Sequence, residues 1–139
     1  MFSIVFAKRE DRAFCATLDP HISEEEFLFK IAQRRYYILR ENLRPAGVMR
    51  YNLFWDTIPC LTLLFLEEGS RGKGYGRAAM EFWEHEMHAR GYGMVLTTTQ
   101  VDEQAQHFYR RLGYRDCGCM TVDIPRYAQP AELFMAKEI

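Results

Sequence analysis

Between residues 71 and 77 the sequence places a glycine at every second position among basic and aromatic side chains. A predicted strand precedes this stretch and a predicted helix follows it, so its N–H groups lie at a helix N-terminus, where they lack intrahelical acceptors and attract anions. Glycines without a Cβ atom allow positive φ angles and close approach of a ligand. The spacing predicts a phosphate-binding loop, and a solvated turn is the alternative. The loop residues are Arg71, Gly72, Lys73, Gly74, Tyr75, Gly76 and Arg77.

Three common phosphate-binding patterns fit this loop poorly. A Walker A loop requires a glycine five positions before its Gly-Lys pair and Ser or Thr after it, but this chain has Glu67 and Gly74 there. A dinucleotide fingerprint is matched formally by Gly74, Gly76 and Ala79, yet it lies in mid-chain and lacks the acidic residue expected about 20 positions later. A kinase glycine loop belongs to a much longer domain.

A fourth pattern matches the chain in two separate blocks. The loop reads Arg-x-x-Gly-x-Gly after an apolar strand, and residues 102–114 contain Ala-x-x-Phe-Tyr-x-x-x-Gly-Tyr. Both blocks resemble the GCN5-related N-acetyltransferase (GNAT) superfamily, and the close resemblance covers about residues 61–114. It implies a single GNAT domain over residues 1–139 that transfers acetyl from acetyl-CoA to a primary amine, either a small molecule or a peptide or protein amine.

The resemblance also implies where acetyl-CoA would bind. The backbone of the strand ending at Leu66 would contact the pantetheine arm and the thioester, and the loop amides would bind the pyrophosphate. Asp102 stands where many relatives carry a cofactor-contacting asparagine, and we expect it to act mainly as a helix cap. The implied cofactor-binding residues outside the loop are Leu64, Leu66, Asp102, Ala105, Phe108 and Tyr109.

Tyr109 matches the family's usual general acid. Direct attack of a neutral amine on the thioester leaves a CoA thiolate that needs a proton. A tyrosine with an ordinary pKa of about 10 can donate to a thiolate whose thiol has a pKa of about 8.5. The alternative for Tyr109 is a buried helical aromatic beside Phe108.

The general base and the acceptor site are less well defined. Relatives often carry a glutamate at the positions of Cys60 and Thr97, which supply no carboxylate. Asp56 is a weak candidate base, with a solvated turn residue as the alternative, and Tyr51 and Trp55 are weak candidates for acceptor binding. The missing carboxylates keep a second hypothesis open, a non-catalytic acyl-CoA-binding sensor on the same fold.

The surrounding sequence predicts the elements that hold these residues. Apolar and β-branched runs predict strands at 2–7, 36–40, 46–55, 58–68, 94–99, 115–123 and 131–137. Caps and helical periodicity predict helices ending near 18, at 23–34, at 74–89 and at 102–113. The strands at 58–68 and 94–99 should be parallel. This α/β (α+β) order suits the GNAT fold, a mixed, mostly antiparallel sheet with splayed central parallel strands, flanked by helices.

Composition bounds the remaining possibilities. A length of 139 residues suits one domain, and a net charge of -1 gives no basic field for nucleic acid. No apolar run approaches the roughly 18 residues of a membrane span, and no signal peptide is evident, so we expect a cytoplasmic protein without a membrane partner. The four cysteines lack zinc-site spacing, which predicts reduced thiols and no metal. The resemblance leaves a homodimer open.

Overall fold

The structure, a computed structural model, describes residues 1–139 and forms two compact units. The first comprises Met1–Asn52 and Thr62–Trp83, and the second comprises Leu53–Leu61 and Glu84–Ile139. The single domain over residues 1–139 stays a prediction.

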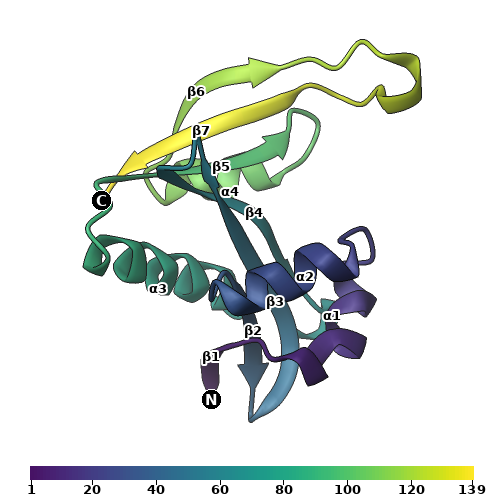
Figure 1. Cartoon of the computed structure of the whole chain (residues 1–139). Helices are drawn as coiled ribbons and strands as arrows, with labels where there is room; N and C mark the ends of the chain where they lie inside the picture. The colour runs from purple at the N-terminus through teal and green to yellow at the C-terminus, as the bar shows by residue number, and fades with distance from the viewer. The chain divides into compact units, whose positions relative to one another are not determined.

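The elements are β1 (Phe2–Phe6), η1 (Arg9–Asp11), α1 (Arg12–Leu18), α2 (Glu24–Ala32), β2 (Tyr36–Glu41), β3 (Arg44–Phe54), β4 (Ile58–Leu66), η2 (Glu68–Ser70), α3 (Tyr75–Ala89), β5 (Met94–Gln100), α4 (Ala105–Arg111), β6 (Arg115–Met120), η3 (Pro125–Tyr127) and β7 (Glu132–Glu138) (Figure 1).

Hydrogen bonds order the strands of the first unit β1-β2-β3-β4. β1 pairs antiparallel with β2, and β2 pairs antiparallel with β3. The β2–β3 hairpin turns at Asn42 and Leu43, which have positive φ angles of 51° and 67°. This turn is tighter than the one expected from the sequence, so β3 begins at Arg44 rather than near residue 46.

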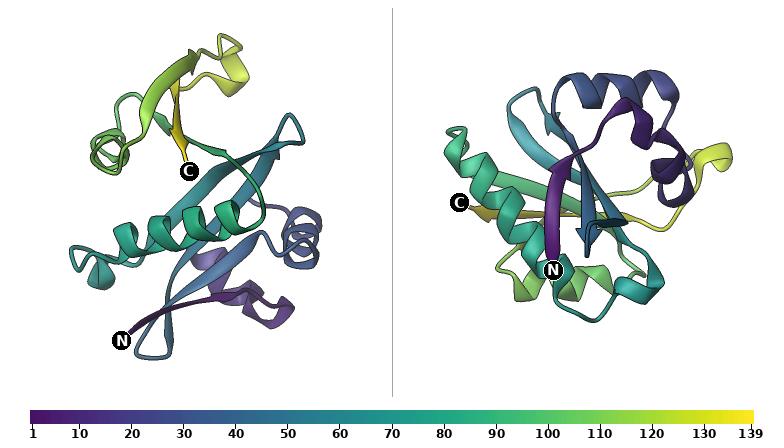
Figure 2. Two further views of the ribbon diagram at one scale, coloured as in Figure 1. Left: turned by 90° about the vertical axis from the view of Figure 1, so that its left-hand side faces the viewer. Right: turned by 90° about the horizontal axis from the view of Figure 1, so that it is seen from below.

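Helices α1 and α2 cover one face of this sheet (Figure 2). Their apolar side chains form a core with those of β2 and β3, in which the rings of Phe27 and Tyr36 meet edge-on at 5.3 Å between centroids. The start of α2 follows the predicted cap, because the Ser23 hydroxyl accepts a hydrogen bond from the Glu26 N–H at 3.1 Å. Cap and core together fix where α2 begins.

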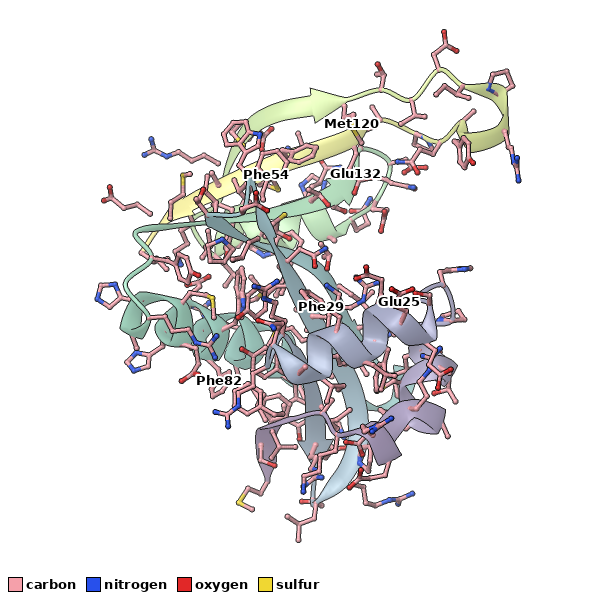
Figure 3. All side chains as sticks on the ribbon, viewed as in Figure 1. Glu25, Phe29, Phe54, Phe82, Met120 and Glu132 are labelled. Carbon is pink, nitrogen blue, oxygen red and sulfur yellow. The ribbon has the colours of Figure 1, made fainter.

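The first turns of α3 cover the other face. Tyr36 and Tyr37 are successive strand residues and so point to opposite faces of the sheet. The Tyr37 ring meets the Phe82 ring of α3 edge-on at 5.9 Å between centroids, and the Tyr51 ring of β3 lies 5.7 Å from the Trp83 ring of α3. Phe82 is labelled in Figure 3. This aromatic packing holds the first half of α3, and with it the glycine loop that precedes the helix.

β3 and β4 approach each other closely at Gly47. A Cβ atom at this position would lie 2.7 Å from the Phe65 carbonyl oxygen and 2.8 Å from Leu66 Cδ2, distances that real Cβ atoms do not show. The Glu67 N–H, just past the strand, donates to the Ala46 carbonyl at 2.8 Å. Glycine at this position therefore allows the β3 backbone to pack directly against the end of β4.

The second unit has the strand order β4-β5-β7-β6. β4 and β5 are parallel, with Cys60 opposite Leu96 and Leu61 opposite Thr97, which confirms the predicted parallel pair. β7 pairs antiparallel with both β5 and β6. The last strand of the chain, yellow in Figure 1, thus lies between two earlier ones.

The mixed, mostly antiparallel α/β arrangement predicted from the sequence is confirmed. Two strands end two to three residues earlier than expected: β4 stops at Leu66, because residues Glu68–Ser70 form a 3₁₀ turn, and β6 stops at Met120. None of the helices has the length and apolar character needed to cross a bilayer.

Candidate functional site

The loop between β4 and α3 carries unpaired backbone N–H groups into the helix. The Arg71 N–H donates to the Glu68 carbonyl at 3.2 Å, and the Ala78 N–H donates to the Gly74 carbonyl at 3.1 Å. Between them, the N–H groups of residues 72–77 have no hydrogen-bond acceptor in the protein. Such a run of donors at the positive end of a helix attracts an anion.

Gly72 and Gly74 give the loop its shape. They adopt left-handed φ angles of 75° and 82°. Other residues reach this conformation at a cost of about 1–2 kcal/mol. A Cβ atom at either position would meet no protein atom within 4 Å, so the space in front of the loop is open. The backbone conformation requires glycine, and a ligand has room to reach the amides.

The end of β4 and the first arginine of the loop interact. Arg71 Nε donates to the Leu66 carbonyl at 3.0 Å, and its guanidinium lies 5.0 Å from the Phe65 ring centroid. Leu64 lies one pleat earlier and is partly buried. Of the backbone groups expected to face a ligand on this strand, the Leu66 carbonyl already accepts a hydrogen bond from Arg71.

The other two basic side chains of the loop have acidic partners. Arg77 pairs with Glu81, one turn along α3, at 2.9 Å. Lys73 pairs with Glu41, at the end of β2, at 2.9 Å. The sequence did not single out Glu41, because no motif joins it to a loop 32 residues away. The backbone amides of residues 72–77, in contrast, have no partner in the protein.

Tyr109 lies on α4 in the second unit and is 7% exposed. Its hydroxyl shares a hydrogen bond with Thr97 of β5, whose Oγ1 donates to the Leu61 carbonyl at 3.5 Å. Leu61 and Thr97 are opposite residues of the parallel β4–β5 pair. The phenol therefore lies beside the junction of these strands. Burial raises the pKa of Tyr109, and its hydrogen bond with Thr97 opposes this shift only in part, so the hydroxyl holds its proton at neutral pH.

Tyr114, the last residue of the second sequence block, packs against Tyr109 of α4. Its ring lies 5.7 Å from that of Tyr109, and its hydroxyl donates to Glu84 Oε2 at 2.8 Å. Lys137 Nζ donates to the other oxygen of Glu84 at 2.7 Å. A buried tyrosine bound to an ion pair in this way fixes the helix end, and Gly113 before it has a φ of 95° that stops the helix.

The expected cap of α4 by Asp102 is wrong. The N-cap is Gln104, in a helical conformation without a side-chain cap, and Asp102 is exposed in the preceding turn. Glu103 and Gln106 hold this turn instead, through hydrogen bonds with the Gln100 N–H at 3.1 Å and the Val101 carbonyl at 2.8 Å. Ala105 and Phe108, the other predicted positions on this helix, are partly buried.

The candidate base lies in a strained turn. Trp55 and Asp56 connect β3 and β4 with positive φ angles of 52° and 62°. Trp55 is 76% exposed, and the exposed Asp56 forms no hydrogen bond or ion pair. Cys60 and Thr97 are buried, and burial raises the pKa of the Cys60 thiol to about 11, so it stays a neutral thiol. Nothing around Asp56 holds its carboxylate toward a substrate.

Tyr51, proposed for acceptor binding, has its ring in the aromatic packing under α3 and is 2% exposed. Its carbonyl oxygen accepts from Lys30 Nζ of α2 at 3.2 Å. Nearby, Arg50 donates twice to Asp19, at 2.7 and 3.0 Å, and Tyr36 donates to the same carboxylate at 2.9 Å. These buried polar groups lie in no motif, so the sequence did not point to them.

Two chemical capacities result, one in each unit. The first unit offers a run of unpaired amides to an anionic ligand. The second unit holds a buried, protonated phenol beside two parallel strands. No group of three or more His, Cys, Asp or Glu side chains is placed to hold a metal ion.

Comparison with known proteins adds a family match and a fold match. The model of the acetyltransferase (GNAT) family matches residues 6–114, and no curated protein matches the chain. The ribosomal-protein-S18-alanine N-acetyltransferase from Escherichia coli has a TM-score of 0.83 at 20% identity, covering 100% of this chain and 94% of that chain. Ard1 from Thermoplasma volcanium has a TM-score of 0.83 at 14% identity, with coverages of 99% and 97%. A GNAT family acetyltransferase from Elizabethkingia anophelis with acetyl-CoA bound has a TM-score of 0.80 at 12% identity, with coverages of 99% and 98%.

The structural likenesses, at these identities, show the fold. The family match covers most of the chain and contains both sequence blocks, the glycine loop and the helix of Tyr109. The predicted acetyltransferase class is thereby confirmed. This chain belongs to the acetyltransferase (GNAT) family.

Proposed function

We propose that this protein transfers an acetyl group from acetyl-CoA to a primary amine, which attacks the thioester directly. The observation that carries this proposal is the run of unpaired N–H groups over residues 72–77, open to solvent at the start of α3. A pyrophosphate, which acetyl-CoA contains, offers the multiple oxygen acceptors that such a run requires. A family neighbour from Elizabethkingia anophelis binds acetyl-CoA.

The remaining proposed contacts with acetyl-CoA lie on β4, on Arg71 and on α4. The strand that leads into the loop, β4, offers backbone groups near Leu64 and Leu66 to the pantetheine arm. The Arg71 side chain, stacked on Phe65, lies beside the first amides of the loop. On α4, Ala105, Phe108 and the preceding Asp102 are the proposed contacts of the second block.

Tyr109 is the proposed general acid. A phenol that is buried and protonated at neutral pH can donate its proton to the CoA sulfur as the thiolate leaves, and the phenolate then takes up a proton from water. Thr97 orients the phenol through their shared hydrogen bond. The amine enters as the neutral base and loses its proton to water, because neither Cys60 nor Thr97 is a carboxylate and Asp56 lies in an exposed turn.

The donor site is tested by coenzyme A binding, measured calorimetrically. Gly74→Ala places an alanine in the left-handed region of φ. A strain of about 1–2 kcal/mol corresponds to a roughly 5- to 30-fold larger dissociation constant for coenzyme A. Gly69→Ala is the matched control, because its Cβ atom also meets no protein atom within 4 Å but its φ is not positive. Absence of coenzyme A binding by the wild-type protein, or equal affinities of wild type and Gly74→Ala, would contradict the proposal.

Turnover separates the enzyme from the sensor. Free thiol release from acetyl-CoA is followed with a panel of small amines and short peptides. Steady release with at least one amine supports the transferase. Tight acetyl-CoA binding without thiol release on any amine would favour a non-catalytic acyl-CoA sensor.

A further inference from the structure

Glu41, the last residue of β2, gathers three side chains that flank the unpaired amides. Ser70 Oγ donates to its Oε1 at 3.2 Å. Lys73 Nζ and the Tyr75 hydroxyl donate to its Oε2 at 2.9 and 2.6 Å. The three donors come from before the glycine loop, from its middle and from the first residue of α3, so one carboxylate ties down the whole loop.

The position of Glu41 is itself rigid. In the β1–β2 ladder it lies opposite Phe2, and in the β2–β3 ladder it lies opposite Arg44. The Phe2 ring stacks on the Tyr75 ring at 4.4 Å between centroids, with only 10° between the ring planes. Tyr75 is therefore held both at its hydroxyl and across its ring by the β1–β2 pair.

Glu41 is an ionised carboxylate that accepts hydrogen bonds from loop side chains and none from the loop amides. Hydrogen bonds from Tyr75 and Lys73 lower the pKa of Glu41 to about 2, so the carboxylate is ionised at all physiological pH values. The same contact raises the pKa of Lys73. Glu41 thus holds the Lys73 ammonium, while the N–H groups of residues 72–77 keep no acceptor.

We propose that Glu41 is a positioning residue for the acyl donor: by accepting hydrogen bonds from Ser70, Lys73 and Tyr75, it holds the loop amides in the arrangement that binds a pyrophosphate. The inference rests on the proposed function. A loop with left-handed glycines at positions 72 and 74 has many alternative conformations once its anchors are removed. Binding then has to order the loop, and affinity falls accordingly.

A simple charge argument makes the opposite prediction. A carboxylate near an anion site repels phosphate, so removing it would strengthen binding if electrostatics dominated. Glu67 provides the matched control, because it is also acidic and next to the loop but its side chain forms no hydrogen bond or ion pair. Comparing Glu41 and Glu67 variants separates anchoring from charge.

The test measures dissociation constants for coenzyme A and for pantetheine, which ends before the pyrophosphate. We expect Glu41→Ala to weaken coenzyme A binding roughly tenfold and to leave pantetheine binding unchanged. Glu41→Gln keeps an oxygen that accepts hydrogen bonds, so it should restore most of the affinity. Glu67→Ala should not weaken binding.

Three results would overturn the role of Glu41: unchanged or tighter coenzyme A binding by Glu41→Ala, an equal loss for coenzyme A and pantetheine, or an equal loss in Glu67→Ala. Failure of the wild-type protein to bind coenzyme A would instead overturn the donor site itself. The two failures are therefore distinguishable in one set of titrations.

Discussion

Lys30 is a buried ammonium whose titration should appear in the stability of the protein. It lies on α2, is 2% exposed, and donates hydrogen bonds to the Tyr51 carbonyl and to Asn52 Oδ1. Burial lowers the pKa of Lys30 from 10.5 to about 8, with Arg50 adding to the shift and Glu26 opposing it. In the unfolded chain the pKa returns to its ordinary value of about 10.4.

The sign and size of the effect follow from this shift. Between about pH 8 and 10.5 the unfolded chain binds a proton that the folded protein has released, so the free energy of unfolding rises with pH. Below about pH 8 both states hold the proton, and Lys30 adds no pH dependence. The full shift corresponds to roughly 3 kcal/mol, of which about 1.4 kcal/mol is gained between pH 7 and pH 9.

The assay is urea unfolding of the wild type and of Lys30→Met at pH 7, 8 and 9. Other titrating groups contribute equally to both proteins, so the difference between them isolates Lys30. We expect the free energy of unfolding of the wild type, relative to that of Lys30→Met, to rise by about 1.4 kcal/mol between pH 7 and pH 9. Lys8→Met, at an exposed lysine, should show no such trend. A difference that is constant with pH, or that moves toward the variant, would refute the reasoning.

Two further predictions concern the proton donor and the strand that leads to the loop. Tyr109→Phe should lower kcat roughly 100-fold with little change in the KM for acetyl-CoA, because only the proton transfer is lost; an unchanged kcat in the thiol-release assay would refute the role. Gly47→Ala should destabilise the protein by about 1–3 kcal/mol, since its Cβ atom would lie 2.7 Å from the Phe65 carbonyl oxygen. Thermal unfolding should show a Tm lowered by roughly 3–10 °C, while Gly118→Ala, in open space, keeps the wild-type Tm; equal Tm values for all three proteins would contradict the close approach.

The fold could be predicted largely from local patterns. Apolar runs marked β4 and β5, and helical spacing with a glycine stop marked α3, because burial on one face imposes these periods on the sequence. The order of the last strands could not be predicted in this way. β7 lies between β5 and β6 because of pairing between distant segments, and no local period records which strand becomes the neighbour.

The helix cap shows how a correct pattern can give a wrong position. Asp102 is a residue type that favours N-caps, but the turn before α4 is held by Glu103 and Gln106, and the helix begins later, at Ala105. Several side chains in one turn compete for the same few backbone donors. Their competition is settled by geometry, and small differences in turn conformation move the cap by two residues.

Glycine spacing and the second block were sufficient to predict the loop before α3, the helix of Tyr109 and the family, because backbone freedom and helical periodicity are properties of neighbouring residues. Three-dimensional packing was required for the remainder. Glu41 reaches Ser70, Lys73 and Tyr75 across 29, 32 and 34 residues, and Lys30 becomes a perturbed base only when α2 closes over β3. Hydrogen bonds and desolvation act over a few ångströms in space, so a chain reveals them only after its strands have paired and its helices have packed.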